Sequence, residues 1–379
     1  MANKKKICVN GFFLAKLKTG IGQYNLNIIC GLLKNDSYNY IIYIPKLNTL
    51  SLEDLPQIIQ DNSLVIDLFY KRDDLLKQFI WEYFYFPYFF QNHTFSLAWS
   101  PYQSVSIIRN IPHVMTVHDV IPNRIKEYIP NWKYSFYFKF LNISIKKAKH
   151  IITISKFCKQ EISSVLNIKK EKIDITYLAA TKKLLSKKTK LKSELIKSKD
   201  KFILYLGGLD LRKNVVNLIK SFKIVSKKYP ELKLYIPGNY FKNPLIPDLP
   251  GLIEDLKLEN QVKLLGYISD NEVNYLLQNA EMLAYPSLYE GFGLPILEGW
   301  INNLPVITSD IGAMKEIAQD GALLINPNNV QSISRGMIKI LSDKNLKNKL
   351  IKNGKKRLES FDWEKTVTKT EKIFDKLLV

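Results

Sequence analysis

Residues 281–300 read EMLAYPSLYEGFGLPILEGW, and this stretch decides the fold. The apolar run at its start is typical of a buried strand, the glycines at 291 and 293 predict a bend, and residues 294–300 predict a helix. In open α/β sheets such a junction presents unpaired helix N–H groups just beyond the end of a strand. The stretch therefore predicts a site for an anion or another polar ligand.

The same alternation of apolar runs and helical patterns extends in both directions along the chain. Strands are predicted at residues 6–13, 38–45, 63–70, 95–99, 113–119, 151–155 and 173–178, and then at 201–208, 233–238, 261–268, 281–287, 304–310 and 322–327. Helices are predicted between them, and from residue 329 to the end with a break at SFDW. Alternation of this kind predicts parallel sheets covered on both faces, in an α/β fold.

Length and composition indicate two folded domains. The chain has 379 residues, of which 46% are hydrophobic and 24% charged, as in ordinary globular proteins. Residues 181–201 are rich in lysine and nearly free of aromatic residues, which predicts a linker. We place an N-terminal domain at residues 1–185, a C-terminal domain at 186–360, and at 361–379 a last helix that returns to the N-terminal domain.

The charge and the cysteines limit the class of protein. A net charge of +21 favours an anionic partner, although background use of lysine explains part of it. Cys8, Cys30 and Cys158 are isolated and predict reduced core residues. Neither a signal peptide nor an apolar run of membrane-spanning length is expected, so the prediction is a cytoplasmic protein, soluble or peripheral at the inner face of the membrane.

Two loops predict phosphate contacts. In KTGIGQY, Gly20 and Gly22 allow close backbone approach in a strand-to-helix turn, and Tyr24 is expected to open the helix. In GGLDLRKN, Arg212 and Lys213 are expected to combine two mobile cations with helix N–H donors, with Asn214 as a helix cap; this suits a diphosphate. Ordinary turn glycines and an exposed basic turn are the structural alternatives.

Two further patterns place polar groups where packing alone does not explain them. In TVHDVIP, His118 and Asp119 end an apolar strand, and a satisfied core histidine is the alternative. Glu290 and Glu298 flank a glycine bend, and buried carboxylates are costly unless they are paired or hydrogen-bonded. Glu298, one turn into the helix, is placed to accept hydrogen bonds from a ribose diol, and Glu290 lies nearer the reacting end.

Taken together, these motifs resemble a known family. The string EGFGLPILE resembles the E-x7-E motif of the family 4 glycosyltransferases, which have the GT-B fold. GIGQY, WSPYQ, TVHDVIP, TISKFCKQEI, GGLDLRKN and FDWEKT follow in the order that this family has, so the resemblance covers nearly the whole chain. The GIG-x-Y and D-x-R-K-N forms are most similar to mannosyl- and rhamnosyltransferases of surface-polysaccharide assembly.

The resemblance implies a fold and roles for individual residues. The fold is two Rossmann-like, doubly wound parallel-sheet domains facing a central cleft. Arg212 and Lys213 bind the donor diphosphate, Glu290 the transferred sugar, and Glu298 the ribose. The remaining implied contacts are Gly22 with the β-phosphate, His118 beside the sugar, Gly266 and Tyr267 with the base, and Gly291, Phe292, Gly293 and Leu294 with sugar and phosphate.

The implied reaction is metal-independent hexosyl transfer with retention of anomeric configuration. The donor is a nucleotide-diphosphate sugar, and GDP-mannose is the first expectation. The alternative is a dTDP- or UDP-sugar, for rhamnosyl, glucosyl or N-acetylglucosaminyl transfer. No cofactor and no metal are expected. The acceptor is a glycan or a lipid-linked glycan.

Three alternatives stay open at this point. The aromatic run at residues 79–90, with the lysines at 133–149, forms either a surface for a lipid-linked acceptor at an anionic membrane or a helix buried in an aromatic-rich domain. A sugar-nucleotide epimerase is a second enzyme class on the same architecture. A nucleic-acid-binding protein, suggested by charge alone, predicts steeply salt-dependent binding and leaves the glutamate pair unexplained; nucleic acid is not an expected partner.

Overall fold

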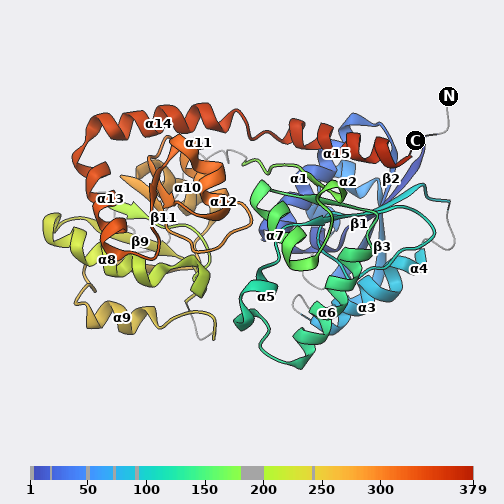
Figure 1. The fold of residues 1–379 in the computed structure, drawn as a ribbon, viewed down its shortest axis with the longest axis horizontal. Helices are drawn as coiled ribbons and strands as arrows, with labels where there is room; N and C mark the ends of the chain where they lie inside the picture. Colours follow the sequence, from blue (N-terminus) through green and yellow to red (C-terminus); the bar gives the residue numbers. More distant parts are fainter. Residues whose placement is uncertain are drawn as a thin grey trace. The chain divides into compact units, whose positions relative to one another are not determined.

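The computed structural model describes residues 4–17, 19–47, 52–70, 74–89, 94–180, 200–240 and 244–378. The predicted linker at 181–201 lies almost entirely outside these ranges. The chain divides into two compact units, residues 1–178 with 363–379, and residues 179–362 (Figure 1). Each unit contains one parallel sheet, and each is described by itself.

In the part of the first unit that the structure describes, seven parallel strands run in the order β3-β2-β1-β4-β5-β6-β7. They are β1 (Lys6–Asn10), β2 (Asn39–Leu47), β3 (Ser63–Tyr70), β4 (Leu97–Ser100), β5 (His113–Val117), β6 (His150–Thr153) and β7 (Ile173–Ile175). Strands β4 and β5 are buried along their whole length. Continuous burial explains why apolar residues predominate in them instead of alternating with polar ones.

The helices of the first unit include one from the far end of the chain. They are α1 (Gly20–Asn35), α2 (Gln57–Gln60), α3 (Leu75–Ile80), α4 (Phe86–Phe89), α5 (Ile121–Arg124), α6 (Trp132–Lys147), α7 (Lys156–Leu166) and α15 (Trp363–Leu378). A π-helical turn at Trp81–Tyr85 joins α3 to α4. Helix α15 packs beside α1 (Figure 1). Its buried face includes Val367 and Phe374.

The second unit repeats the doubly wound arrangement. Within its described residues, six parallel strands run in the order β10-β9-β8-β11-β12-β13. They are β8 (Phe202–Leu204), β9 (Lys233–Pro237), β10 (Val262–Gly266), β11 (Met282–Tyr285), β12 (Val306–Ser309) and β13 (Leu323–Ile325). In both sheets the winding reverses in the middle, between β1 and β4 and between β8 and β11. Ligands bind outside the carboxyl ends of strands at such a reversal.

Helices cover the second sheet. They are α8 (Val215–Lys228), α9 (Leu249–Asp255), α10 (Asp270–Asn279), α11 (Leu294–Ile301), α12 (Gly312–Ala318), α13 (Val330–Ser342) and α14 (Lys344–Leu358). Helices α8 and α13 lie side by side, and α11 packs against α14. The break between α14 and α15 falls at residues 359–362, which confirms the predicted interruption at SFDW.

Two expectations about helix ends are wrong. Helix α1 begins at Gly20 and not at Tyr24, because the Thr19 side chain accepts the Gly22 N–H at 3.0 Å and caps the helix there. Asn214 occupies the cap position of α8, but its side chain caps nothing. Instead its Nδ2 donates to the carbonyls of Pro286 at 2.9 Å and Pro327 at 2.8 Å, which ties the start of α8 to the loop after β11.

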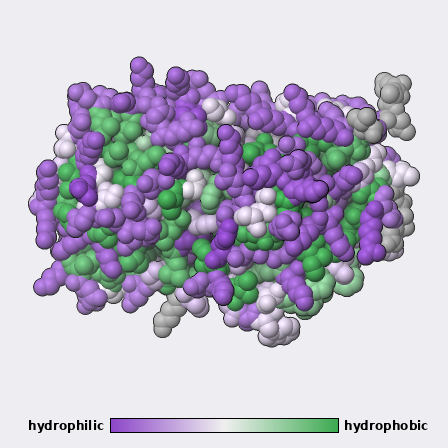
Figure 2. Space-filling view, viewed as in Figure 1, coloured by the Kyte–Doolittle hydropathy of each residue, from purple (hydrophilic) through white to green (hydrophobic). Residues whose placement is uncertain are grey.

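The surface and the cysteines agree with the composition. Hydrophilic residues cover much of the face shown in Figure 2. All three cysteines are free, as predicted; Cys8 and Cys158 are buried and Cys30 is half-buried. None of the helices in the described ranges is long and apolar enough to cross a membrane.

Candidate functional site

The central strands of the second sheet bring two loops together. Strand β8 ends at Leu204 and leads into the loop with Arg212 and Lys213, and β11 ends at Tyr285 and leads into the loop with Glu290. Because β8 and β11 are neighbours at the reversal of the winding, both loops leave the same edge of the sheet. The Leu288 N–H donates to the Arg212 carbonyl at 2.7 Å and joins the two loops directly.

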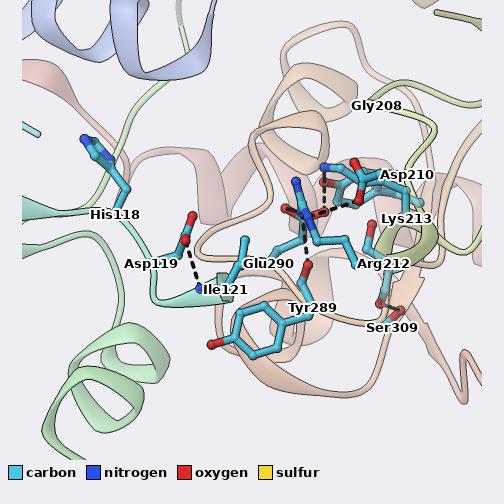
Figure 3. Close-up of polar contacts among 12 residues, drawn as sticks. His118, Asp119, Ile121, Gly208, Asp210, Arg212, Lys213, Tyr289, Glu290 and Ser309 are labelled. Atoms are coloured by element: carbon cyan, nitrogen blue, oxygen red, sulfur yellow. Dashed lines mark hydrogen bonds and ion pairs between the residues drawn. The ribbon is translucent and has the colours of Figure 1, made fainter. Parts of the chain in front are cut away.

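Charged side chains from these loops form one buried cluster, which we call the ion-pair cluster: Asp210, Arg212, Lys213 and Glu290 (Figure 3). The Glu290 carboxylate lies between both cations, with Arg212 Nη1 at 2.7 Å from Oε2 and Lys213 Nζ at 2.6 Å from Oε1. Arg212 Nε lies 3.2 Å from Asp210 Oδ1. Two cations and two carboxylates make the cluster formally neutral.

Neutral groups complete the ion-pair cluster. Lys213 Nζ donates to the Tyr285 hydroxyl at 3.0 Å, and Arg212 Nη1 donates to the Tyr289 carbonyl at 3.1 Å. Lys213 and Glu290 are each 7% exposed, and both cations are held in ion pairs with Glu290. Burial alone raises the pKa of Glu290, but Lys213 and Arg212 outweigh it and hold the pKa below its ordinary value.

The glycine bend explains how Glu290 reaches this position. Gly293 has φ +106°, a backbone conformation that favours glycine, and it stands at the start of α11. Helix α11 therefore begins directly after the bend. Glu298 lies on its second turn, as predicted, and is partly exposed. The two glutamates thus belong to different elements, one to the bend and one to the helix.

In the first unit, His118 directly follows β5 and is buried. Its ring Nε2 donates to the Pro101 carbonyl at 3.2 Å, and its backbone N–H donates to Gln103 Oε1 at 3.1 Å. The Tyr24 ring packs edge-on against the imidazole at 4.8 Å between centroids. Burial lowers the pKa of His118 to about 4, so the ring is neutral at neutral pH.

Comparison with known proteins shows the family. A model described as Glycosyltransferase Family 4 matches residues 20–179, and one described as Glycosyl transferases group 1 matches residues 186–357. Between them, these matches include six of the seven described strands of the first sheet, all six described strands of the second sheet, and the ion-pair cluster. The chain belongs to the glycosyltransferases of the GT-B fold.

The relatives and solved structures agree with this assignment. The O-antigen chain mannosyltransferase RfbU of Salmonella typhimurium is 28% identical over 86% of this glycosyltransferase and 88% of the relative. The O-antigen chain mannosyltransferase B of Escherichia coli is 29% identical over 69% and 70%.

Two solved structures share the fold at low identity. Sucrose-phosphate synthase from Thermosynechococcus elongatus has a TM-score of 0.75 at 17% identity, over 99% of both chains. The lipopolysaccharide glycosyltransferase WaaG has a TM-score of 0.70 at 15% identity, over 97% of this chain and 98% of that one. The predicted fold class, two Rossmann-like parallel-sheet domains of the GT-B type, is confirmed.

Two predicted glycine positions have clear structural reasons in this glycosyltransferase. A Cβ on Gly22 would lie 2.2 Å from the Lys16 carbonyl oxygen, so the first turn of α1 packs on the preceding loop only with glycine there. Gly266 ends β10 with φ +65°, and Tyr267 beyond it is 78% exposed. Contacts of these residues with phosphate or base stay predictions.

The bend residues play different structural parts. Phe292 is buried and packs edge-on against Phe361 at 5.7 Å, so its side chain belongs to the core, and only its backbone is available to a ligand. Gly291 is buried beside it, and Leu294 begins α11 and is partly exposed. Their roles as backbone donors stay predictions.

Sequence reasoning missed two members of the site, Asp210 and Tyr285. Asp210 lies within the quoted GGLDLRKN loop, and its acidic charge beside two cations was the available signal. Tyr285 ends a strand that otherwise reads as purely apolar, and only the position of its hydroxyl at the strand end distinguishes it. Tyr205, which directly follows the neighbouring strand β8, is also fully buried, and its hydroxyl donates to the Gly208 carbonyl.

A second feature lies on the first unit, where the run at residues 79–90 is partly buried and partly exposed. Trp81 and Phe86 are buried, whereas other large apolar side chains of α3, the π-helical turn, α4 and α6 are exposed. We call these the aromatic surface: Leu76 (68% exposed), Phe84 (57%), Tyr88 (56%), Trp132 (74%) and Phe136 (48%). The run therefore combines the two alternatives: one part is a buried helix in an aromatic-rich domain, and another part is exposed.

Helix α6, which carries two residues of the aromatic surface, is cationic. Helix α6 contains Lys133, Lys139, Lys146 and Lys147 and no acidic residue. The Phe79 ring of α3 stacks on the Tyr83 ring of the π-helical turn, with 5.3 Å between centroids. It also contacts the Phe136 ring of α6, with 5.6 Å between centroids. A pocket of about 290 Å³, lined mainly by apolar side chains, opens beside Trp132.

Proposed function

We propose that this glycosyltransferase moves mannose from GDP-mannose to a glycan or lipid-linked glycan in surface-polysaccharide synthesis, retaining the anomeric configuration without a metal. One observation carries the proposal: Arg212 and Lys213 are fixed by Glu290 at the carboxyl edge of the two central strands. The relatives named O-antigen chain mannosyltransferases support mannose as the sugar.

The chemistry follows from charge. As the glycosidic bond breaks, negative charge grows on the departing diphosphate, and cations already held in position stabilise that charge more in the transition state than in the ground state. Because the ion-pair cluster is formally neutral, the donor brings the excess negative charge. In our proposal Arg212 and Lys213 turn part of their donors to phosphate oxygens, while sugar hydroxyls donate to Glu290 in their place.

The proton of the acceptor needs no strong base. The departing phosphate oxygen takes it on the face from which the acceptor attacks. His118 is neutral, and its Nε2–H is already donated to Pro101, so we assign it a hydrogen-bonding role beside the sugar through Nδ1. Glu298 accepts hydrogen bonds from the ribose hydroxyls.

The first test is donor binding. GDP-, UDP-, dTDP- and ADP-sugars are titrated with chelator present, following the melting temperature of the wild type, Lys213→Ala and Glu298→Ala. We expect GDP-mannose to stabilise the wild type and both variants to bind it more weakly. Lys220→Ala, an exposed cation on α8, is the matched control and should bind as the wild type does. Stabilisation by a dTDP- or UDP-sugar alone would replace the mannosyl assignment by one of its alternatives.

Transfer itself is tested with radiolabelled GDP-mannose and lipid-linked glycan extracts. We expect an acceptor-dependent mannosylated product whose new linkage has the anomeric configuration of the donor by NMR. Release of a changed sugar nucleotide without acceptor would indicate an epimerase activity. Loss of activity in chelator would refute metal independence.

We further propose that the aromatic surface contacts an anionic membrane, because α6, which carries two of its exposed aromatic side chains, also carries four lysines and no acidic residue. A cationic surface does not pair with a second copy of itself, which argues against a dimer there. We expect the protein to sediment with phosphatidylglycerol vesicles and not with phosphatidylcholine vesicles. The double variant Trp132→Ser, Phe136→Ser should remain in the supernatant.

A charge-matched pair separates this contact from general attraction by the net charge of +21. Lys139→Glu with Lys146→Glu removes cations on α6, and Lys352→Glu with Lys356→Glu makes the same change on α14. Only the α6 pair should release the protein from vesicles. Equal loss in both pairs would mean that the attraction is nonspecific.

A further inference from the structure

The first unit holds a buried carboxylate that the proposed reaction does not use. Glu82 is the second residue of the π-helical turn between α3 and α4, and it is 0% exposed. Such turns are rare and are frequently found at functional sites. Within the described residues no lysine, arginine or histidine pairs with it, so its charge is stabilised by neutral donors alone.

Three donors from different elements reach the carboxylate. Oε2 accepts the Val105 N–H and the Tyr137 hydroxyl, both at 3.0 Å, and Oε1 accepts Gln78 Nε2 at 2.9 Å. The backbone carbonyl of Glu82 accepts the Ser106 hydroxyl at 2.6 Å. Glu82 is therefore bound twice to one segment, which we call the 101–106 loop.

The 101–106 loop has neither helix nor strand, although most of it is buried. Buried backbone groups outside regular structure need other partners. Glu82 supplies one of them, for the Val105 N–H, and Asn25 of α1 supplies another by donating to the Pro101 carbonyl at 3.2 Å. The loop leaves β4 at the reversal of the first sheet, where ligand-binding loops of this fold class lie.

The same loop holds His118. Pro101 accepts the imidazole Nε2–H, and Gln103 accepts the backbone N–H of His118. The carbonyl of Pro101 fixes the proton on Nε2 and leaves the lone pair on Nδ1. A displacement of the loop would change both the direction and the protonated nitrogen of the ring.

We infer that Glu82 is a positioning residue: it fixes the 101–106 loop and, through that loop, the ring of His118. The inference rests on the proposed function, in which His118 lies beside the transferred sugar. Glu82 itself is fully buried and touches no substrate. Its removal should therefore lower turnover while the nucleotide, bound by the second unit, is held as before.

Two substitutions at this position have opposite expectations. Glu82→Gln keeps the shape of the side chain. The introduced carbonyl can accept from the Val105 N–H and the Tyr137 hydroxyl, and the introduced NH₂ can donate to the amide oxygen of Gln78 once the Gln78 amide group rotates by about 180°. Glu82→Leu keeps the volume but leaves Val105 without an acceptor. We expect Glu82→Leu to lose at least about tenfold in kcat and Glu82→Gln to stay within about threefold of the wild type.

A pH profile separates positioning from simple packing. Burial raises the pKa of Glu82 to about 7, and the titratable groups facing it are Tyr137 of α6 and Tyr102 of the loop, with Cys8 of β1 in the same core cluster. The charged carboxylate accepts the stronger hydrogen bonds. The wild-type kcat should therefore fall as the pH decreases through about 7, and in Glu82→Gln this inflection should be absent.

The deciding experiment does not depend on turnover. The four histidines are labelled with ¹⁵N, His118 is assigned with His118→Gln, and its Nε2 and Nδ1 shifts are compared between the wild type and the two Glu82 variants. We expect unchanged shifts in Glu82→Gln, altered shifts in Glu82→Leu, and equal GDP affinity in all three.

Unchanged His118 shifts in Glu82→Leu would overturn the inference, as would equal disturbance in both variants. If Glu82→Leu does not fold, Ser106→Ala removes the other bond between Glu82 and the loop and must alter the same shifts. Absence of mannosyl transfer in the wild type would refute the proposed function and leave this NMR result standing.

Discussion

Glu290 and Glu82 are both buried carboxylates, and the two units stabilise them in different ways. Glu290 lies between Arg212 and Lys213, and these cations hold its pKa below the ordinary value in spite of burial. Glu82 has only neutral hydrogen-bond donors, and burial raises its pKa to about 7. Cations thus favour the charged form of one carboxylate, whereas burial among neutral donors leaves the other able to titrate near neutral pH.

The difference corresponds to different tasks. A fixed negative charge holds two cations ready for a diphosphate, which suits a binding and catalytic cluster. A carboxylate that only accepts hydrogen bonds can fix a loop, most strongly when it is charged, and an amide of the same shape keeps acceptor and donor groups in the same places. The following changes test this contrast, beginning with the largest expected effect.

Replacing Lys213 by methionine should have the largest effect. It removes one of two cations facing the diphosphate and leaves Glu290 with Arg212 only, so we expect a loss of roughly 10²- to 10³-fold in kcat/KM. Initial-rate kinetics with GDP-mannose measure it. Lys220→Met, which makes the same substitution at an exposed lysine of α8, is the control. Equal rates for both variants would contradict the role of Lys213 in binding the diphosphate.

Glu290→Gln should separate binding from catalysis. The ion-pair cluster then carries a formal charge of +1, because one carboxylate and two cations remain. We expect GDP to bind up to about tenfold more tightly, since a negative charge facing the diphosphate is gone, while kcat decreases. Calorimetric titration of GDP gives the affinity, and weaker binding would show that Glu290 is needed mainly to hold the cations in place.

Glu82→Gln should stabilise the protein at alkaline pH. A pKa raised from 4.5 to about 7 in the folded state means that stability is fully present below about pH 4.5 and is lost as the pH rises through about 7. The amide has no such loss, so the variant should exceed the wild type by up to about 3 kcal/mol at about pH 8. Urea unfolding at about pH 5 and pH 8 measures the free energy of unfolding, and an equal difference at both would refute the titration.

The smallest effects come from two tyrosines, each of which contacts one cluster. Tyr137→Phe removes a donor to Glu82, and Tyr285→Phe removes an acceptor for Lys213; each should cost about 1 kcal/mol of unfolding free energy. Only the Tyr137→Phe loss should grow with pH, because that hydroxyl stabilises the charged form of Glu82. Urea unfolding across the same pH range compares the two losses of unfolding free energy. The same pH dependence in both variants would contradict the difference between the two carboxylates.

Much of the fold could be predicted, because strand and helix periods are local. The mainly apolar runs at β5 and β11 predicted strands buried on both faces, and the glycines after β11 predicted the bend that starts α11. The family resemblance through EGFGLPILE was also readable from the printed residues, and the comparisons confirm it. These features need no knowledge of which strands lie side by side.

The features that the sequence did not predict depend on contacts between distant segments. Asn214 was expected to cap α8, but its side chain instead binds carbonyls at Pro286 and Pro327, far along the chain. Glu82 gave no signal at all, because a glutamate in an aromatic helical run has the pattern of an exposed residue, and the π turn that buries it breaks the helical period.

By itself the sequence determined the α/β class, the doubly wound units and the loops that carry the charged residues, since each follows from short-range periodicity and backbone preference. Only the tertiary structure decided that β8 lies next to β11, so that Glu290 closes on Arg212 and Lys213, 78 and 77 positions earlier. It likewise decided that Glu82 meets Val105 and that, among the described residues, no cation pairs with it. Strand order and burial set the partner of each charge, and the partner sets whether that charge is fixed or can titrate.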